Sequence, residues 1–140
     1  MADKSFKVLE KIQKYFSKKG IKYTTHSEKA RMFVSYNADN FKSVQFIIDL
    51  TEEGRLVSYH AFSLFKAKED ALPACYKFCN MMNCQYRWVR SYMDNDDEFT
   101  VALDAVLNER SAGEECYELL ARMVNITDDI MGEYKKLTNQ

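Results

Sequence analysis

The chain has 140 residues, 46% of them hydrophobic and 29% charged, so it can form one domain with a real core and is too apolar to be disordered. Its formal net charge of −1 gives no basic field that would favour nucleic acid as a partner. No apolar run approaches the ~18 residues of a membrane-spanning helix, and the polar N-terminus lacks the apolar core of a signal peptide. We therefore expect a single cytoplasmic domain over residues 1–140 whose cysteines are thiols.

Residues 5–20, SFKVLEKIQKYFSKKG, have the period of an amphipathic helix, with Leu9, Ile12 and Phe16 on one face. Gly20 is expected to end this helix, because glycine adopts the left-handed conformation at low cost. The opposite face is either solvated or binds an acidic partner. It consists of Lys4, Lys7, Lys11, Lys14 and Lys18.

Three segments then alternate like strands, over residues 31–37, 42–50 and 55–62. The sequence TEEG joins the last two as a hairpin. A register that pairs Leu50 with Arg55 places the apolar side chains of both strands on one face. A glycine-containing loop also allows a register shifted by one residue.

Residues 71–83, ALPACYKFCNMMN, return to helical spacing, with Pro73 in the first turn, where its missing N–H costs nothing. Residues 111–137 have the period of a long C-terminal helix, and Ser111 and Glu114 have the spacing of a capping box. The apolar stripe of this last helix is Cys116, Leu119, Leu120, Met123, Ile130, Tyr134 and Leu137.

Between these helices, QYRWVRSYM and EFTVALDAVL flank the turn DNDD and are predicted to form a second hairpin. Pairing Met93 with Glu98 opposes Arg87 to Asp104 as a cross-strand charge pair. The same register puts the aromatic residues of the first segment, together with Arg90, on the core face. The predicted order is α-β-β-β-α-β-β-α, an α+β sandwich in which helices pack on one face of an antiparallel sheet. The other face meets water or a second subunit.

This order, with FCNMMN (residues 78–83) closing the middle helix, resembles the YbjN-like family of bacterial proteins, which are described as sensory transduction regulators. In that family the middle helix ends in an apolar residue followed by Asn-x-x-Asn, matched here by Asn80 and Asn83. We expect both asparagines to terminate the helix, with Asn83 as its cap. The resemblance implies a fold similar to that of type III secretion chaperones, which form dimers and bind extended segments of client proteins.

The segment CYKFCNMMNC places three cysteines in ten positions. Cys75 and Cys79 share a helix face, and Cys84 and Cys116 could complete a tetrahedral zinc site with them. However, the spacing is not the CxxC pair of zinc ribbons, and Cys75 and Cys79 also extend an apolar stripe, where cysteine packs as a small hydrophobe. We expect buried, inert thiols and no metal site, with Cys84 as the candidate reactive thiol.

No catalytic arrangement emerges from the sequence. His26 and His60 lie in no metal-type spacing, and the acidic turn lacks the glycine and closing glutamate of a calcium loop. A glycine-rich phosphate loop is also absent. We therefore predict no enzyme activity, no catalytic residue and no cofactor.

The predicted partner-binding residues are Trp88, Arg90 and Tyr92. Arg90 either packs its stem on the two rings while its head reaches an edge, or anchors a carboxylate or carbonyl of a bound segment. We expect a chaperone-like regulatory module in bacterial signalling or stress regulation, which binds a protein or peptide segment, forms a homodimer, and binds neither nucleic acid nor membrane. The alternative is a small-ligand sensor with an aromatic-lined pocket.

Overall fold

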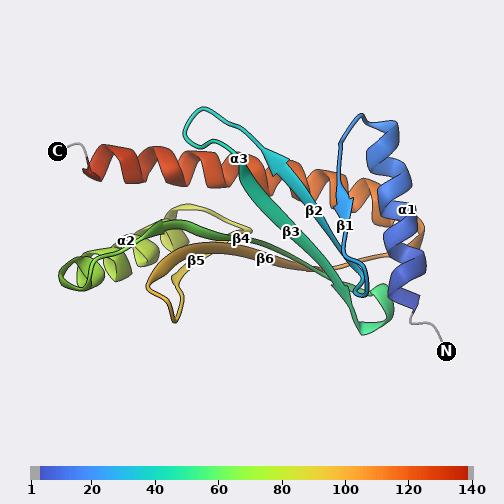
Figure 1. Cartoon of the computed structure of the whole chain (residues 1–140), viewed down its shortest axis with the longest axis horizontal. Coiled ribbons are helices and arrows are strands. Elements are labelled where there is room, and N and C mark those ends of the chain that lie inside the picture. The colour runs from blue at the N-terminus through green and yellow to red at the C-terminus, as the bar shows by residue number, and fades with distance from the viewer. Residues whose placement is uncertain (1–3, 139–140) are drawn as a thin grey trace.

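The computed structural model describes residues 4–138, which form an antiparallel sheet flanked by helices (Figure 1). The strand order is β1-β2-β3-β4-β6-β5. This arrangement confirms the predicted order of elements and adds the two-residue strand β1. The elements are α1 (Lys4–Lys18), β1 (Thr24–Thr25), β2 (Arg31–Tyr36), β3 (Val44–Thr51), β4 (Leu56–Lys66), α2 (Leu72–Gln85), β5 (Arg90–Met93), β6 (Glu98–Val106) and α3 (Ala112–Thr138).

Helix α1 buries its apolar face and ends where the sequence predicts. Gly20 has φ 77° and its N–H donates to the Ser17 carbonyl at 3.1 Å, while Ile21 N–H donates to the Phe16 carbonyl at 2.9 Å. These two bonds form a Schellman motif, which satisfies carbonyls that the helix leaves unpaired.

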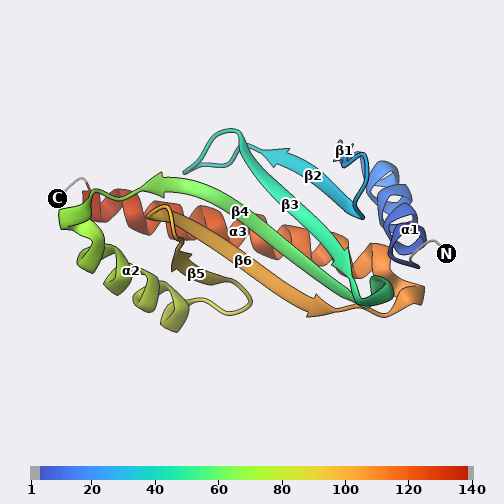
Figure 2. The same ribbon diagram turned by 60° about the horizontal axis from the view of Figure 1, so that its bottom comes forward.

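Helix α3 runs along the length of the sheet, with α1 near its N-terminal end and α2 near its C-terminal end (Figure 1). In Figure 2, β4 and β6 pass in front of α3, so one sheet face is turned toward this helix. Buried Tyr59 links the two layers, because its hydroxyl donates to the Cys116 carbonyl at 2.7 Å. At the start of α3, the side chain that accepts a backbone hydrogen bond is Glu115 and not the predicted Glu114. The Glu115 carboxylate accepts from Asn108 N–H at 2.9 Å. Within residues 4–138, no helix has the length and apolarity required to cross a bilayer.

The first hairpin has a register two residues away from the predicted one. Leu50 pairs with Val57 instead of Arg55, because the turn is longer and contains three consecutive residues of positive φ, Glu52, Glu53 and Gly54. A shift of two residues keeps every side chain on its face. The predicted partner residue is therefore wrong, and the predicted core face is confirmed.

The second hairpin is shifted by one residue, which turns the side chains of β5 to the opposite face, while β6 keeps its predicted core face. Met93 pairs with Phe99 instead of Glu98. The physical reason lies in the turn: the Asp94 carboxylate accepts from Glu98 N–H at 3.1 Å, and Asp97 has φ 59° and adds a residue to the loop. Arg90 therefore lies on the outer face, where the predicted register placed it in the core.

Candidate functional site

Asn83 joins α2 to the edge of the sheet. Its Oδ1 accepts from Ser91 N–H at 2.7 Å and its Nδ2 donates to the Ser91 carbonyl at 3.1 Å. The helix continues to Gln85, so the prediction that Asn83 caps it is wrong. The side-chain amide instead takes the place of a neighbouring strand along the outer edge of β5, while Asn80 is exposed.

The predicted partner-binding residues do not form one cluster. Arg90 and Tyr92 share the outer face of β5, where Arg90 Nη1 lies 2.7 Å from Asp104 Oδ2. Trp88 precedes β5, has φ 75° and is 53% exposed. The cation over its ring is Arg122 of α3, at 5.2 Å from the centroid, and not Arg90.

The sheet face turned away from α3 carries a belt of charged and aromatic side chains, which we call the open face. Arg31 pairs with Asp49, and the Asp104 carboxylate also accepts from Ser58 Oγ at 2.6 Å. The His60 ring is half-buried and stacks on Phe62 at 5.0 Å. The ladder places the following residues in adjoining rows, and Phe62 joins them through its stacking on His60: Arg31, Phe33, Ile47, Asp49, Ser58, His60, Arg90, Tyr92 and Asp104.

Phe62 is the exposed aromatic residue of this face that sequence reasoning missed. Its ring is 48% exposed. The sequence contains one signal for it, since Phe62 follows the alternating segment that predicts β4 and has the parity of the polar residues Ser58 and His60.

Burial and charge set the ionisation of the open face. Desolvation lowers the pKa of His60, and the nearby Arg90 guanidinium lowers this pKa further. Burial of the Asp104 carboxyl works against ionisation, but hydrogen bonds from Ser58 and Arg90 outweigh it and lower the pKa of Asp104. At neutral pH this favours neutral imidazole between fixed ion pairs.

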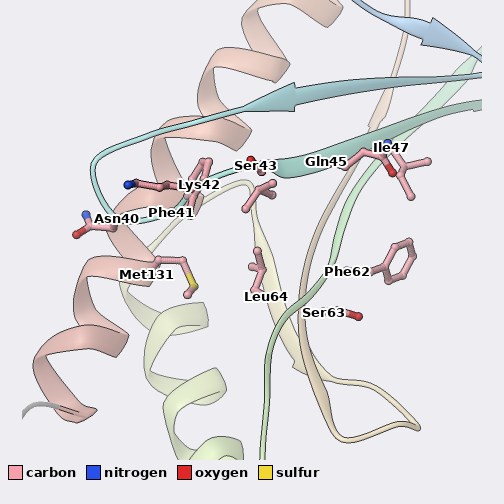
Figure 3. Close-up of a pocket in the computed structure, with 11 residues that line it drawn as sticks. Asn40, Phe41, Lys42, Ser43, Gln45, Ile47, Phe62, Ser63, Leu64 and Met131 are labelled. Carbon is pink, nitrogen blue, oxygen red and sulfur yellow. The ribbon is translucent and has the colours of Figure 1, made fainter.

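A pocket of about 460 Å³ opens where β3 and β4 separate, and we call it the split pocket (Figure 3). The β3–β4 ladder ends at the pair Ile47–His60, and β4 bulges between Ala61 and Phe65 against β6. Asn40 and Lys42 lie at one end of the pocket, with Phe62 at the other (Figure 3). The lining residues are Asn40, Phe41, Lys42, Ser43, Val44, Gln45, Ile47, Phe62, Ser63, Leu64 and Met131.

A second pocket, of about 380 Å³, lies between the ends of β4 and α3 and the start of α2, and we call it the aromatic pocket. Phe65, Phe78 and Tyr134 line it, and the rings of Phe65 and Tyr134 stack at 3.8 Å. Cys75 is at its wall and is half-buried, and burial raises the pKa of this thiol.

The other cysteines divide into buried and exposed thiols. Burial raises the pKa of Cys79 to about 11 and that of Cys116 to about 12. Cys84 is exposed at the end of α2. In the described part of the chain, no three side chains of histidine, cysteine, aspartate or glutamate are grouped so that they could hold a metal ion.

Residues 9–134 match the family described as "YbjN: Putative bacterial sensory transduction regulator". The chain belongs to the YbjN family. The crystal structure of YbjN from E. coli, described as "a putative transcription regulator", is similar with a TM-score of 0.64 at 11% sequence identity, over 90% of this chain and 92% of that one. No curated protein sequence matches the chain.

The YbjN fold is also similar to that of a type III secretion chaperone. SycH of Yersinia pestis, in complex with a stable fragment of YscM2, has a TM-score of 0.53 at 14% identity, over 84% of this chain and 94% of that one. Both likenesses confirm the predicted chaperone-like α+β fold. The family description supports a regulatory role.

Proposed function

We propose that this protein is a non-enzymatic module that binds a segment of a partner protein on the open face of its sheet, and regulates or chaperones that partner. The observation that carries the proposal is the exposed Phe62 ring, stacked on His60 and set among oriented ion pairs on a sheet face turned away from α3. Aromatic anchors beside fixed polar groups are typical of protein-binding surfaces. The complex of SycH with a YscM2 fragment supports a protein as the class of partner.

Affinity capture from the native cell, followed by identification of the bound proteins, tests this proposal. We expect Phe62→Ala, Arg90→Ala and Tyr92→Ala each to reduce capture of a specific partner. Lys22→Ala changes an exposed position between α1 and β1, outside the lysine face of α1, and is the control, which should leave capture unchanged. If all three variants retain every partner that the wild-type protein captures, the open face is not the binding surface.

We also propose that the protein is a cytoplasmic homodimer that acts in bacterial signalling or stress regulation. Helix α2 supports the dimer, because it leaves Tyr76 55% and Met81 45% exposed on a surface that a second copy could cover. Sedimentation equilibrium should give twice the chain mass for the wild-type protein and the chain mass for Tyr76→Ser combined with Met81→Ser. A monomeric wild-type protein contradicts the proposal.

The aromatic pocket favours a second candidate function, which is sensing of a small ligand. Its stacked rings and apolar walls suit a planar apolar molecule. A thermal-shift screen against metabolites tests this function. A reproducible rise in Tm with one ligand class that is lost in Tyr134→Ala supports it, and no rise with any class rejects it.

A further inference from the structure

The sheet is interrupted at the split pocket. Strands β3 and β4 pair from Thr51–Leu56 to Ile47–His60, and β2 pairs with β3 over the whole of residues 44–49. Residues 44–46 of β3 therefore have ladder partners on β2 and none on β4. Beyond the pair Ile47–His60, β4 diverges from β3 (Figure 2), and the split pocket lies between the two strands (Figure 3).

The direction of the backbone groups follows from the ladder. Leu50 N–H donates to the Ala30 carbonyl at 2.9 Å, on the β2 side. Because backbone groups alternate in direction along a strand, those of Phe46 also face β2, and those of Gln45 face the gap. The N–H and C=O of Gln45 thus form a short stretch of strand edge inside the sheet. At the outer edge of the sheet, by contrast, Asn83 hydrogen-bonds the backbone groups of Ser91.

The rims of the gap are held in a conformation that costs energy. Ser43 and Ser63 have φ values of 55° and 58°, which lie in the left-handed region that non-glycine residues rarely occupy. Asn37 fixes the first of them, since its Oδ1 accepts from Ser43 N–H at 2.7 Å. Ser43 and Ser63 lie on opposite sides of the gap, and their strained backbone keeps β3 and β4 from pairing there.

The lining favours one kind of occupant. Phe41 and Met131 are buried and supply an apolar floor. The exposed Lys42 ammonium stands at one end and forms no ion pair with any residue in 4–138, whereas the nearby Asp128 carboxylate already accepts from Asn40 N–H at 2.7 Å. An extended peptide with an apolar residue next to an acidic one complements both features.

We propose that the split pocket binds a short extended segment of the partner protein, which pairs its backbone with Gln45, places an apolar side chain on the Phe41–Met131 floor and sets a carboxylate against Lys42. This inference rests on the proposed function and assigns the part of the surface that recognises the partner's main chain. Main-chain pairing supplies affinity in this mode, and the floor and the lysine supply selectivity.

A phage-displayed library of random dodecapeptides, selected on the wild-type protein, supplies the probe. We expect enriched peptides to carry an acidic residue beside an apolar one, and to bind Gln45→Pro at least tenfold more weakly. Proline removes the Gln45 N–H without touching the β2 ladder, whereas Gln45→Ala keeps the N–H and is the matched control. Lys42→Glu should shift the selection toward basic peptides.

A second measurement does not depend on how Gln45→Pro folds. N-methylation of a single amide of the selected peptide should abolish binding to the wild-type protein, and the peptide should slow hydrogen exchange at Gln45. Failure to enrich any peptide, or peptides that bind Gln45→Pro and Gln45→Ala equally and tolerate every N-methylation, overturns the inference. If peptides bind Gln45→Pro as tightly as the wild-type protein and lose binding only to Arg90→Ala, which lies outside the split pocket, the proposed function stands without this inference.

Discussion

Gly54 occupies the tightest position of the first turn. It has φ 82°, and a Cβ built there would lie 2.6 Å from Val8 Cγ2 of α1. Gly20 has φ 77° with nothing within 4 Å of such a Cβ. We expect Gly20→Ala to cost about 1–2 kcal/mol for its conformation alone, and Gly54→Ala about 2–5 kcal/mol because overpacking is added. Urea unfolding of both variants measures the difference. Equal losses of unfolding free energy would mean that the Val8 side chain moves aside at no cost in stability.

The four cysteines should react in the order of their exposure. Cys84 is exposed, whereas burial raises the pKa of Cys79 to about 11 and that of Cys116 to about 12, so these two hold little thiolate at pH 8. We expect a disulfide reagent such as DTNB to modify Cys84 rapidly, Cys75 slowly, and the other two only on unfolding. Cys84→Ser should remove the fast phase. A fast phase that persists in Cys84→Ser would contradict this order.

At the scale of elements, Asn83 holds α2 against β5 through both backbone groups of Ser91. Asn83→Ala should cost about 1–3 kcal/mol, because it removes two hydrogen bonds and leaves the Ser91 amide without its partner. Asn80→Ala lies one helical turn away on the exposed side and should change stability by about 0.5 kcal/mol or less. Denaturant unfolding measures both, and hydrogen exchange at Ser91 should accelerate only in the first. Matching values for the two asparagines would refute a special role for Asn83.

The two hairpins show which parts of an element can be read from sequence. Alternation predicts the core face of β3 and β4, and this survives a register error of two residues. In the second hairpin, one additional residue in the turn changes which side chains of β5 face the core. Asp97, with φ 59°, is that additional residue. No propensity distinguishes a four-residue turn from one lengthened by an aspartate in the left-handed conformation. Arg90 was therefore predicted on the wrong side, although its location on β5 is right.

At the scale of the whole molecule, the open face should make stability depend on pH. The pKa of His60 is lowered by desolvation and by Arg90, with opposing contributions from Asp104 and Asp49 and a further lowering by Arg31. Because the unfolded chain binds the proton more readily, stability falls as pH drops through the ordinary histidine value of about 6.5. Tm measured between pH 8 and pH 5.5 should decrease in the wild-type protein and decrease less in His60→Gln. Identical slopes would show that His60 does not contribute.

The candidate sites were predictable only in part. Trp88 and Tyr92 were predicted for their chemistry, but the split pocket arises where β4 bulges between Ala61 and Phe65, at the end of the strand that alternation predicts over residues 55–62. Its floor also needs Met131 from the far end of the chain. Sites built from strand divergence and distant helices depend on tertiary packing, which local periodicity does not encode.

The strand order also predicts the order in which the parts of the sheet form during folding. Strands β1 to β4 form one meander of neighbours in sequence, β5 and β6 form a local hairpin, and only the β4–β6 ladder joins them, pairing Tyr59 with Leu103. Loop-closure entropy delays contacts between distant residues, so the two halves should form early and meet late along this seam. The seam carries fully buried side chains, so its closure also completes the core. A chain arrested before that step would expose the facing edges of β4 and β6, and this makes the seam the place where folding and self-association compete.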